Sequence, residues 1–100
     1  EVQIPLPGLG TVNKISYGIG YIKVLVLDGK PSKTNPIGDF STSNGIRYIT
    51  INLSNLDELI TICSKNNVTI INSGMTIRPG VTVALIQDPD GNLIELMQTT

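Results

Sequence analysis

Histidine is absent from the 100-residue sequence, and cysteine occurs once, as Cys63. Histidine-activated serine and cysteine nucleophiles, two-histidine iron sites and most catalytic zinc sites all need imidazole, because imidazole titrates near neutral pH and binds transition metals. The chain alone therefore cannot build any of these sites. A lone cysteine cannot form an internal disulfide, which agrees with a reducing compartment, and we expect a cytoplasmic location.

Excess charge of one sign and long apolar runs are also missing. Seven Lys and Arg residues stand against eight Asp and Glu residues, so no basic surface is available for phosphate backbones and we expect no nucleic-acid partner. Apolar runs end well short of the roughly 20 residues that span a bilayer, so we expect no membrane role. The first residue is Glu1 and not Met, and we expect the natural product to include an N-terminal part upstream of it.

The residues that are present favour a mainly β structure with one helix, because β-branched residues are frequent and only residues 55–67 have a helical period. Strands are predicted at 11–17, 21–27, 46–53, 68–71, 81–87 and 93–98. The first two flank Gly18-Ile19-Gly20 and form a hairpin. Residues 28–45 contain two prolines and three glycines and are predicted to be a linker loop.

Cap, turn and loop residues predict where the elements after residue 46 begin and end. Ser54 or Asn55 is expected to cap the helix, and residues 88–92 are expected to form a tight turn. Residues between 71 and 81, with Gly74, are predicted to be a loop. The order from residue 46 onward is β-α-β-β-β.

An internal echo links the two ends of the chain. Residues 20–25 resemble residues 91–96 when Ile22-Lys23-Val24 is aligned with Ile94-Glu95-Leu96. On this alignment, residues 1–27 are the tail of a second β-α-β-β-β unit whose opening strand and helix are absent.

Three segments carry a family resemblance: Gly45-Ile-Arg-Tyr-Ile-Thr-Ile51, Leu56-Asp-Glu-Leu59 and, above all, Ala84-Leu-Ile-Gln-Asp-Pro-Asp-Gly-Asn-Leu-Ile-Glu-Leu96. In these segments the sequence resembles the vicinal oxygen chelate superfamily, which includes glyoxalase I, bleomycin-resistance proteins and extradiol dioxygenases. The resemblance implies an α+β fold in which paired βαβββ modules form a curved mixed sheet cup. It also implies a single domain over residues 1–100, with a partial first module (1–27), a linker (28–45) and a complete second module (46–98).

The resemblance places metal ligands on the first and last strands of each module. Only Glu95 matches such a ligand, while Lys23 and Tyr48 occupy two other ligand positions. An ammonium group repels a divalent cation and offers no lone pair. We therefore expect no cofactor, and we expect a small-molecule ligand bound in the cup. The residues expected to face into the cup are Lys23, Tyr48, Thr50, Asn52, Gln87, Glu95 and Met97, and those expected on the helix side are Val24, Ile49, Ile51, Ile94 and Leu96.

Each candidate also has a structural interpretation. Glu95 is either a metal ligand or general base, or the ion-pair partner of Lys23. Tyr48 either binds the ligand or lines the wall of the cup, and Lys23 either holds an anionic group or has a structural role. Cys63 lies on the apolar stripe of the helix, which favours packing over catalysis.

Three functions therefore stay open. The first is a divergent glyoxalase-like or bleomycin-resistance-like domain that binds a small organic molecule without the usual metal centre. The second is a metal-dependent lyase or isomerase of the glyoxalase type, with Zn, Ni, Mn or Fe held by Glu95 and by ligands from an upstream segment or a partner subunit. The third is a structural dimerisation module. A homodimer is expected in each case, because a first module without its opening strand exposes a sheet edge.

Overall fold

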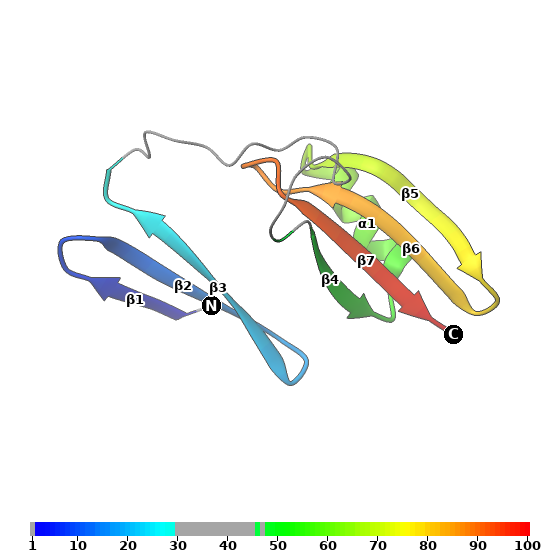
Figure 1. The fold of residues 1–100 in the computed structure, drawn as a ribbon, viewed down its shortest axis with the longest axis horizontal. Helices are drawn as coiled ribbons and strands as arrows, with labels where there is room; N and C mark the ends of the chain where they lie inside the picture. Colours follow the sequence, from blue (N-terminus) through cyan, green and yellow to red (C-terminus); the bar gives the residue numbers. More distant parts are fainter. Residues whose placement is uncertain (1, 30–45, 47) are drawn as a thin grey trace. The chain divides into compact units, whose positions relative to one another are not determined.

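The computed structural model describes residues 2–29, 46 and 48–100, and the chain divides into two compact units, residues 1–34 and 35–100. In the first unit, β1 (Val2–Leu6), β2 (Gly10–Tyr17) and β3 (Gly20–Leu27) form an antiparallel sheet in that order, here called the first sheet (Figure 1). The β2–β3 hairpin confirms the prediction. Gly18, at its turn, has a φ of +52°, a left-handed value that glycine adopts at little cost.

Strand β1 was missed in the sequence because Pro5 lies within it. Proline cannot donate a ladder hydrogen bond, but it is tolerated on an edge strand. β1 is such an edge, with Pro5 opposite Thr11 of β2. The first unit therefore has three strands where the local pattern predicted two, and three is the number that the internal echo implies.

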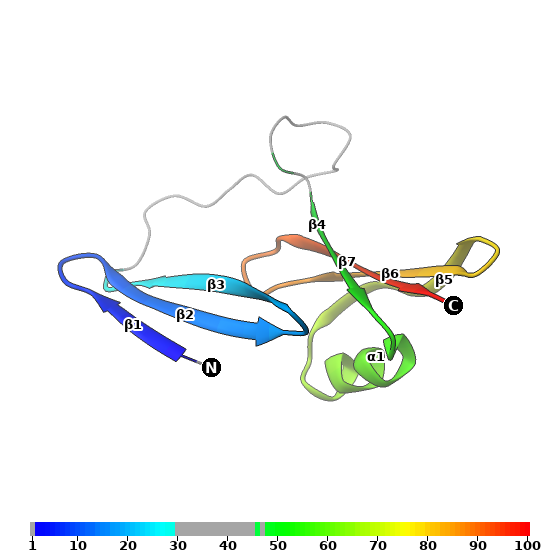
Figure 2. The same ribbon diagram turned by 90° about the horizontal axis from the view of Figure 1, so that it is seen from below.

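The second unit has the predicted β-α-β-β-β order: β4 (Tyr48–Leu53), α1 (Leu56–Lys65), β5 (Thr69–Arg78), β6 (Val81–Gln87) and β7 (Leu93–Thr99). Its four strands form the second sheet, in the order β4-β7-β6-β5, with β4 parallel to β7 and the other pairs antiparallel. Figure 2 shows α1 on one face of this sheet. No helix among the described residues is long and apolar enough to cross a membrane.

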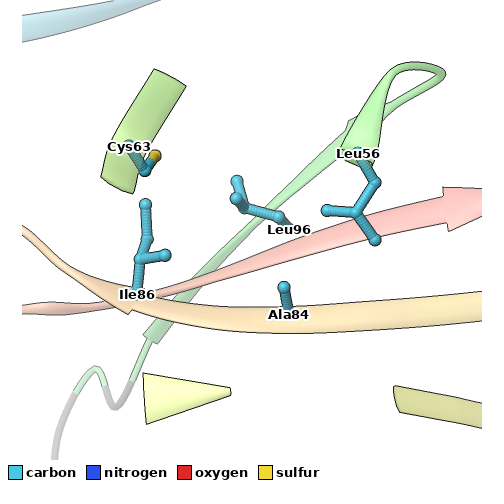
Figure 3. Packing of buried hydrophobic residues seen from close by; sticks show 5 residues of the cluster. All are labelled: Leu56, Cys63, Ala84, Ile86 and Leu96. Carbon is cyan, nitrogen blue, oxygen red and sulfur yellow. The ribbon is translucent and has the colours of Figure 1, made fainter. Parts of the chain in front are cut away.

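A small core joins α1 to the second sheet. Leu56 and Cys63 point from the helix toward three buried sheet residues, Ala84, Ile86 and Leu96 (Figure 3). Leu56 and Leu96 are each only 2% exposed, and a leucine buried to this extent contributes roughly 1.5–3 kcal/mol. The burial of Cys63 confirms its packing role.

Two local predictions need correction. Asn55 occupies the N-cap position of α1 but makes no side-chain cap bond; the backbone N–H of Leu56 instead donates to Oε1 of Gln98, at 2.8 Å. Residues 72–78, predicted as a loop, belong to β5. That strand continues past Gly74 because register shifts interrupt its pairing with β6 without ending it. At the shift, the Gly74 N–H donates to Oδ1 of Asn72, at 2.9 Å.

The predicted turn between β6 and β7 is confirmed. The Asp88 Oδ1 accepts the backbone N–H groups of Asp90, at 3.0 Å, and Asn92, at 2.7 Å. Oδ2 of the same carboxylate accepts from Nδ2 of Asn92, at 2.9 Å. The carboxylate is therefore engaged in organising the turn, which is what the sequence pattern indicated.

Candidate functional site

The face of the second sheet opposite α1 holds most of the predicted site residues. Ala84, Ile86 and Leu96 point to the helix, so the residues that alternate with them along β6 and β7 point the other way. We call this side the open face. Its central members, matched by strand register, are Tyr48, Thr50, Asn52, Met75, Val83, Leu85, Gln87, Leu93, Glu95 and Met97.

Glu95 lies near the middle of the open face and is partly buried. It is directly opposite Thr50 of β4, whose hydroxyl donates to Oε1 of Glu95, at 2.9 Å. Within the described residues of the second unit, the Glu95 carboxylate has no ion pair. One of its oxygens is thus fixed by Thr50, and the other has acceptor capacity for a further donor.

An apolar row crosses the open face beside Glu95. Val83 is opposite Met75 on one side and opposite Met97 on the other. These are the only two methionines in the sequence. Val83 is 7% exposed and Met75 is 51% exposed, and Asn52 continues the row on β4 opposite Met97. Unbranched thioether side chains adapt to different shapes, which suits them to contact with a ligand.

Tyr48 and Gln87 lie at the other end of the open face, on either side of Leu93. Tyr48 is therefore two residues along β4 from Thr50, the residue that contacts Glu95. Its side chain is 45% exposed. Nε2 of Gln87 donates to the Gly91 carbonyl oxygen, at 3.4 Å, so this amide is partly engaged by the neighbouring turn.

Of the five apolar residues expected on the helix side, three lie in the core or against it and two do not. Ile51, Ile94 and Leu96 belong to the core or pack against it. Ile49 is 51% exposed although it shares their side of the sheet, because β4 is an edge strand that extends beyond the helix-covered area. Val24 lies in the first unit and is 44% exposed.

Lys23 belongs to the first sheet, where it is directly opposite Lys14 of β2. The Lys14 Nζ lies 4.3 Å from the centroid of the Tyr21 ring, and the Lys23 Nζ lies 5.7 Å from it. Sequence reasoning missed Lys14 and Tyr21. The signal that could have identified them is the hairpin itself, because pairing 11–17 with 21–27 across a short turn brings Lys14 opposite Lys23.

The donor set of the open face does not match a metal centre. Over the described residues, no three His, Cys, Asp or Glu side chains lie close enough together to hold a metal ion. The open face supplies one carboxylate, from Glu95, with neutral hydroxyl and amide groups around it. Transition metals in proteins are usually held by three or four nitrogen, sulfur or carboxylate ligands.

The fold is similar to several solved structures. TioX from Micromonospora sp. ML1 is 19% identical, with a TM-score of 0.63, over 99% of this chain and 77% of that one. A glyoxalase family protein from Bacillus cereus is 13% identical, with a TM-score of 0.71, over 89% of this chain and 61% of that one. A third structure, a putative glyoxalase family protein from Bacillus anthracis, is 20% identical, with a TM-score of 0.61, over 98% of this chain and 72% of that one.

A comparison with curated proteins gives no match. The family model of the glyoxalase/bleomycin resistance protein/dioxygenase superfamily matches residues 12–96. This range includes β2 from Val12 onward, all of β3 and the second unit up to Leu96 in β7. The chain belongs to the glyoxalase/bleomycin resistance protein/dioxygenase superfamily.

Proposed function

We propose that the chain binds a small organic molecule on the open face of the second sheet, without a resident metal centre. The observation that carries the proposal is the combination on this face of an adaptable apolar row, Met75–Val83–Met97, with a carboxylate held in place by Thr50. Small-molecule sites are typically apolar surfaces with a few well-placed polar groups.

The polar groups have distinct roles in this proposal. Glu95 accepts a hydrogen bond from a hydroxyl or amine of the ligand, and Thr50 orients the carboxylate by holding Oε1. Asn52 offers both a donor and an acceptor beside Met97. Tyr48 and Gln87 flank the far end of the site, and the Met97 side chain contacts the apolar body of the ligand.

The donor set supports the metal-free form of the proposal. The sequence has no histidine, and the Thr50 hydroxyl donates a hydrogen bond to Glu95, so this carboxylate already acts as a hydrogen-bond acceptor. The competing function, a metal-dependent lyase or isomerase of the glyoxalase type, requires the remaining ligands to come from residues outside those described or from a partner subunit. Glu95 would then be a ligand or a general base.

Binding is tested by thermal shift with a panel of neutral, anionic and cationic small molecules, followed by calorimetry on the hits. We expect at least one saturable ligand, and Asn52→Ala or Met97→Ala should weaken its binding about tenfold, through loss of a hydrogen bond or of apolar contact. Ile62→Ala, on the exposed surface of α1, is the matched control. A panel without any saturable ligand would overturn the proposal and favour the structural dimerisation module.

Metal analysis of the purified protein separates the two ligand-binding functions. We expect less than stoichiometric Zn, Ni, Mn and Fe in both the natural chain and the Glu95→Gln variant. Stoichiometric metal that is lost in Glu95→Gln would contradict the metal-free form and establish the metal-dependent alternative.

We also propose that the protein is a homodimer, and that it acts in the cytoplasm. The dimer proposal is supported by strand β3, which forms one edge of the first sheet. Strand β7 is the counterpart of β3 in the second sheet, and its equivalent edge pairs with β4. An uncovered edge presents unpaired backbone groups that another strand can bind.

A further inference from the structure

One face of the first sheet concentrates positive charge at one end and apolar side chains at the other. Strand register places Lys14 and Lys23 opposite each other on this face, with Val2 of β1 beside Lys14. The next row along the sheet holds Ile4, Val12 and Leu25, and the row after it holds Leu6, Gly10 and Leu27. We call this surface the lysine face.

The two lysines have no counterion in the described part of their unit. Neither Lys14 nor Lys23 makes an ion pair there. The one described acidic residue of the first unit is Asp28, and it follows the far end of β3, five residues from Lys23 or roughly 16 Å at the rise of an extended strand. Like charges directly opposite each other across a strand pair are destabilising.

Tyr21 offsets part of this repulsion. Its ring lies 4.3 Å from Nζ of Lys14 and 5.7 Å from Nζ of Lys23, so one aromatic group attracts both ammonium groups. The contacts hold both ammonium groups beside the same ring. Two neighbouring cations that have no carboxylate partner among the described residues of their unit form an electrostatic site for an anion, because an anion bound to both offsets their repulsion.

The apolar rows beside the lysines are accessible. Ile4 is 41% exposed, Leu25 is 45% exposed and Leu27 is 40% exposed. A ligand whose anionic group reaches the lysines would therefore lay the rest of its body on aliphatic side chains. Charge complementarity and the order of the rows together select an amphiphilic anion over a neutral or cationic molecule.

We propose that Lys14, Tyr21 and Lys23 bind the carboxylate or phosphate group of a small amphiphilic ligand, whose apolar body lies along Ile4 and Leu25. This inference goes beyond the proposed function, because it assigns a ligand site to the first sheet alone. It also gives Lys23 a role as an anion-binding residue at a position where the family resemblance implies a metal ligand.

The test uses octanoate and octyl phosphate as probes, with octylamine and octanamide as the cationic and neutral counterparts, and calorimetry at low salt. We expect the two anions to bind and the two counterparts to bind at least tenfold more weakly. Lys14→Gln and Lys23→Gln should each weaken octanoate binding about three- to tenfold, and added salt should weaken it in the natural chain. Lys65→Gln, on α1, is the matched control.

The effect of each variant on folding is measured separately from its effect on binding, as the melting temperature without ligand. Lys14→Gln and Lys23→Gln remove a like-charge contact, so the ligand-free variants should melt at or above the temperature of the natural chain. Tyr21→Phe keeps the ring and should keep octanoate binding, whereas Tyr21→Leu removes the cation–π contacts and should weaken it. Tighter binding of octyl phosphate than of octanoate would assign the natural headgroup as a phosphate, and the reverse order would assign it as a carboxylate.

The outcomes distinguish this inference from the proposed function. Equal binding of all four probes, or octanoate binding that is unchanged in both lysine variants, would overturn the inference. In that case, a panel ligand that is lost in Asn52→Ala would still support binding on the open face. Octanoate binding that is lost in the lysine variants and retained in Asn52→Ala would support the inference.

Discussion

The side-chain carbonyl of Gln98 closes the N-terminus of α1 by accepting the backbone N–H of Leu56, at 2.8 Å. The two residues are 42 positions apart in the sequence. They meet because Gln98 is opposite Leu53, the last residue of β4, and α1 begins shortly after it. One hydrogen bond thus joins the last strand of the second sheet to the first turn of the helix that covers it.

Gln98→Ala should lower the free energy of unfolding by about 1 kcal/mol, the usual effect of losing an N-terminal cap. Gln98→Glu should retain most of the stability, because the carboxylate keeps an acceptor near the positive end of the helix dipole. Asn55→Ala is the control with little effect, since Asn55 makes no cap bond. Denaturant unfolding followed by circular dichroism gives all three values, and equal losses in Gln98→Ala and Asn55→Ala would contradict this account.

The Gln98 cap illustrates which parts of the fold the sequence predicts. The helix and the turn after Asp88 depend on neighbours in sequence, and local pattern predicts them correctly. The cap depends on β7 lying beside β4, which no local pattern encodes. Strand β1 was missed because Pro5 interrupts the pattern, and its pairing with β2 is visible only in the sheet.

The candidate site also has features that local sequence pattern predicts and features that it does not. Alternation along β4 and β7 correctly predicts that Thr50 and Glu95 share a face, because a strand has a side-chain period of two. It does not predict that Thr50 lies directly opposite Glu95, because this depends on the parallel register. Met75 was missed because the bulged end of β5 does not alternate cleanly in sequence.

Gly10→Ala should destabilise the first sheet by about 1–3 kcal/mol, the usual cost of overpacking a close contact. A Cβ at Gly10 would lie 2.9 Å from the Cα of Leu27 and closer still to the Val26 carbonyl oxygen, and both are backbone atoms that cannot rotate away. Gly20→Ala, in the same hairpin, is the matched control, because beyond its chain neighbours its Cβ would come nearest to Cε1 of Tyr17, at 3.8 Å. Thermal unfolding should separate the two variants, and an equal, small effect of both would count against the close approach at Gly10.

Asp88→Ala should cost about 1–3 kcal/mol, because two backbone N–H groups and the Asn92 amide lose their common acceptor. Asp88→Asn keeps one acceptor oxygen and should lose less. Asp90→Ala, in the same turn, is expected to be nearly silent, since the contact of Asp90 is made by its backbone N–H. The measurement is chemical denaturation with and without added Ca²⁺. A calcium-dependent rise in stability that disappears in Asp88→Ala would show that the turn is a cation site.

Strand β3 pairs on only one side within the described residues, and this edge and its exposed apolar side chains give the prediction on oligomeric state. Val24 is 44% exposed and Val26 is 55% exposed, and charged side chains on edge strands are an effective block to strand pairing. We expect a dimer in sedimentation at micromolar concentration, and we expect Val24→Lys and Val26→Lys to shift the equilibrium toward the monomer. Ile62→Lys places the same charge on an exposed helix position, 46% exposed, and should leave the dimer intact. Because the variants change exposed positions, circular dichroism should show retained folding. A natural chain that sediments as a single monomeric species would refute the prediction directly.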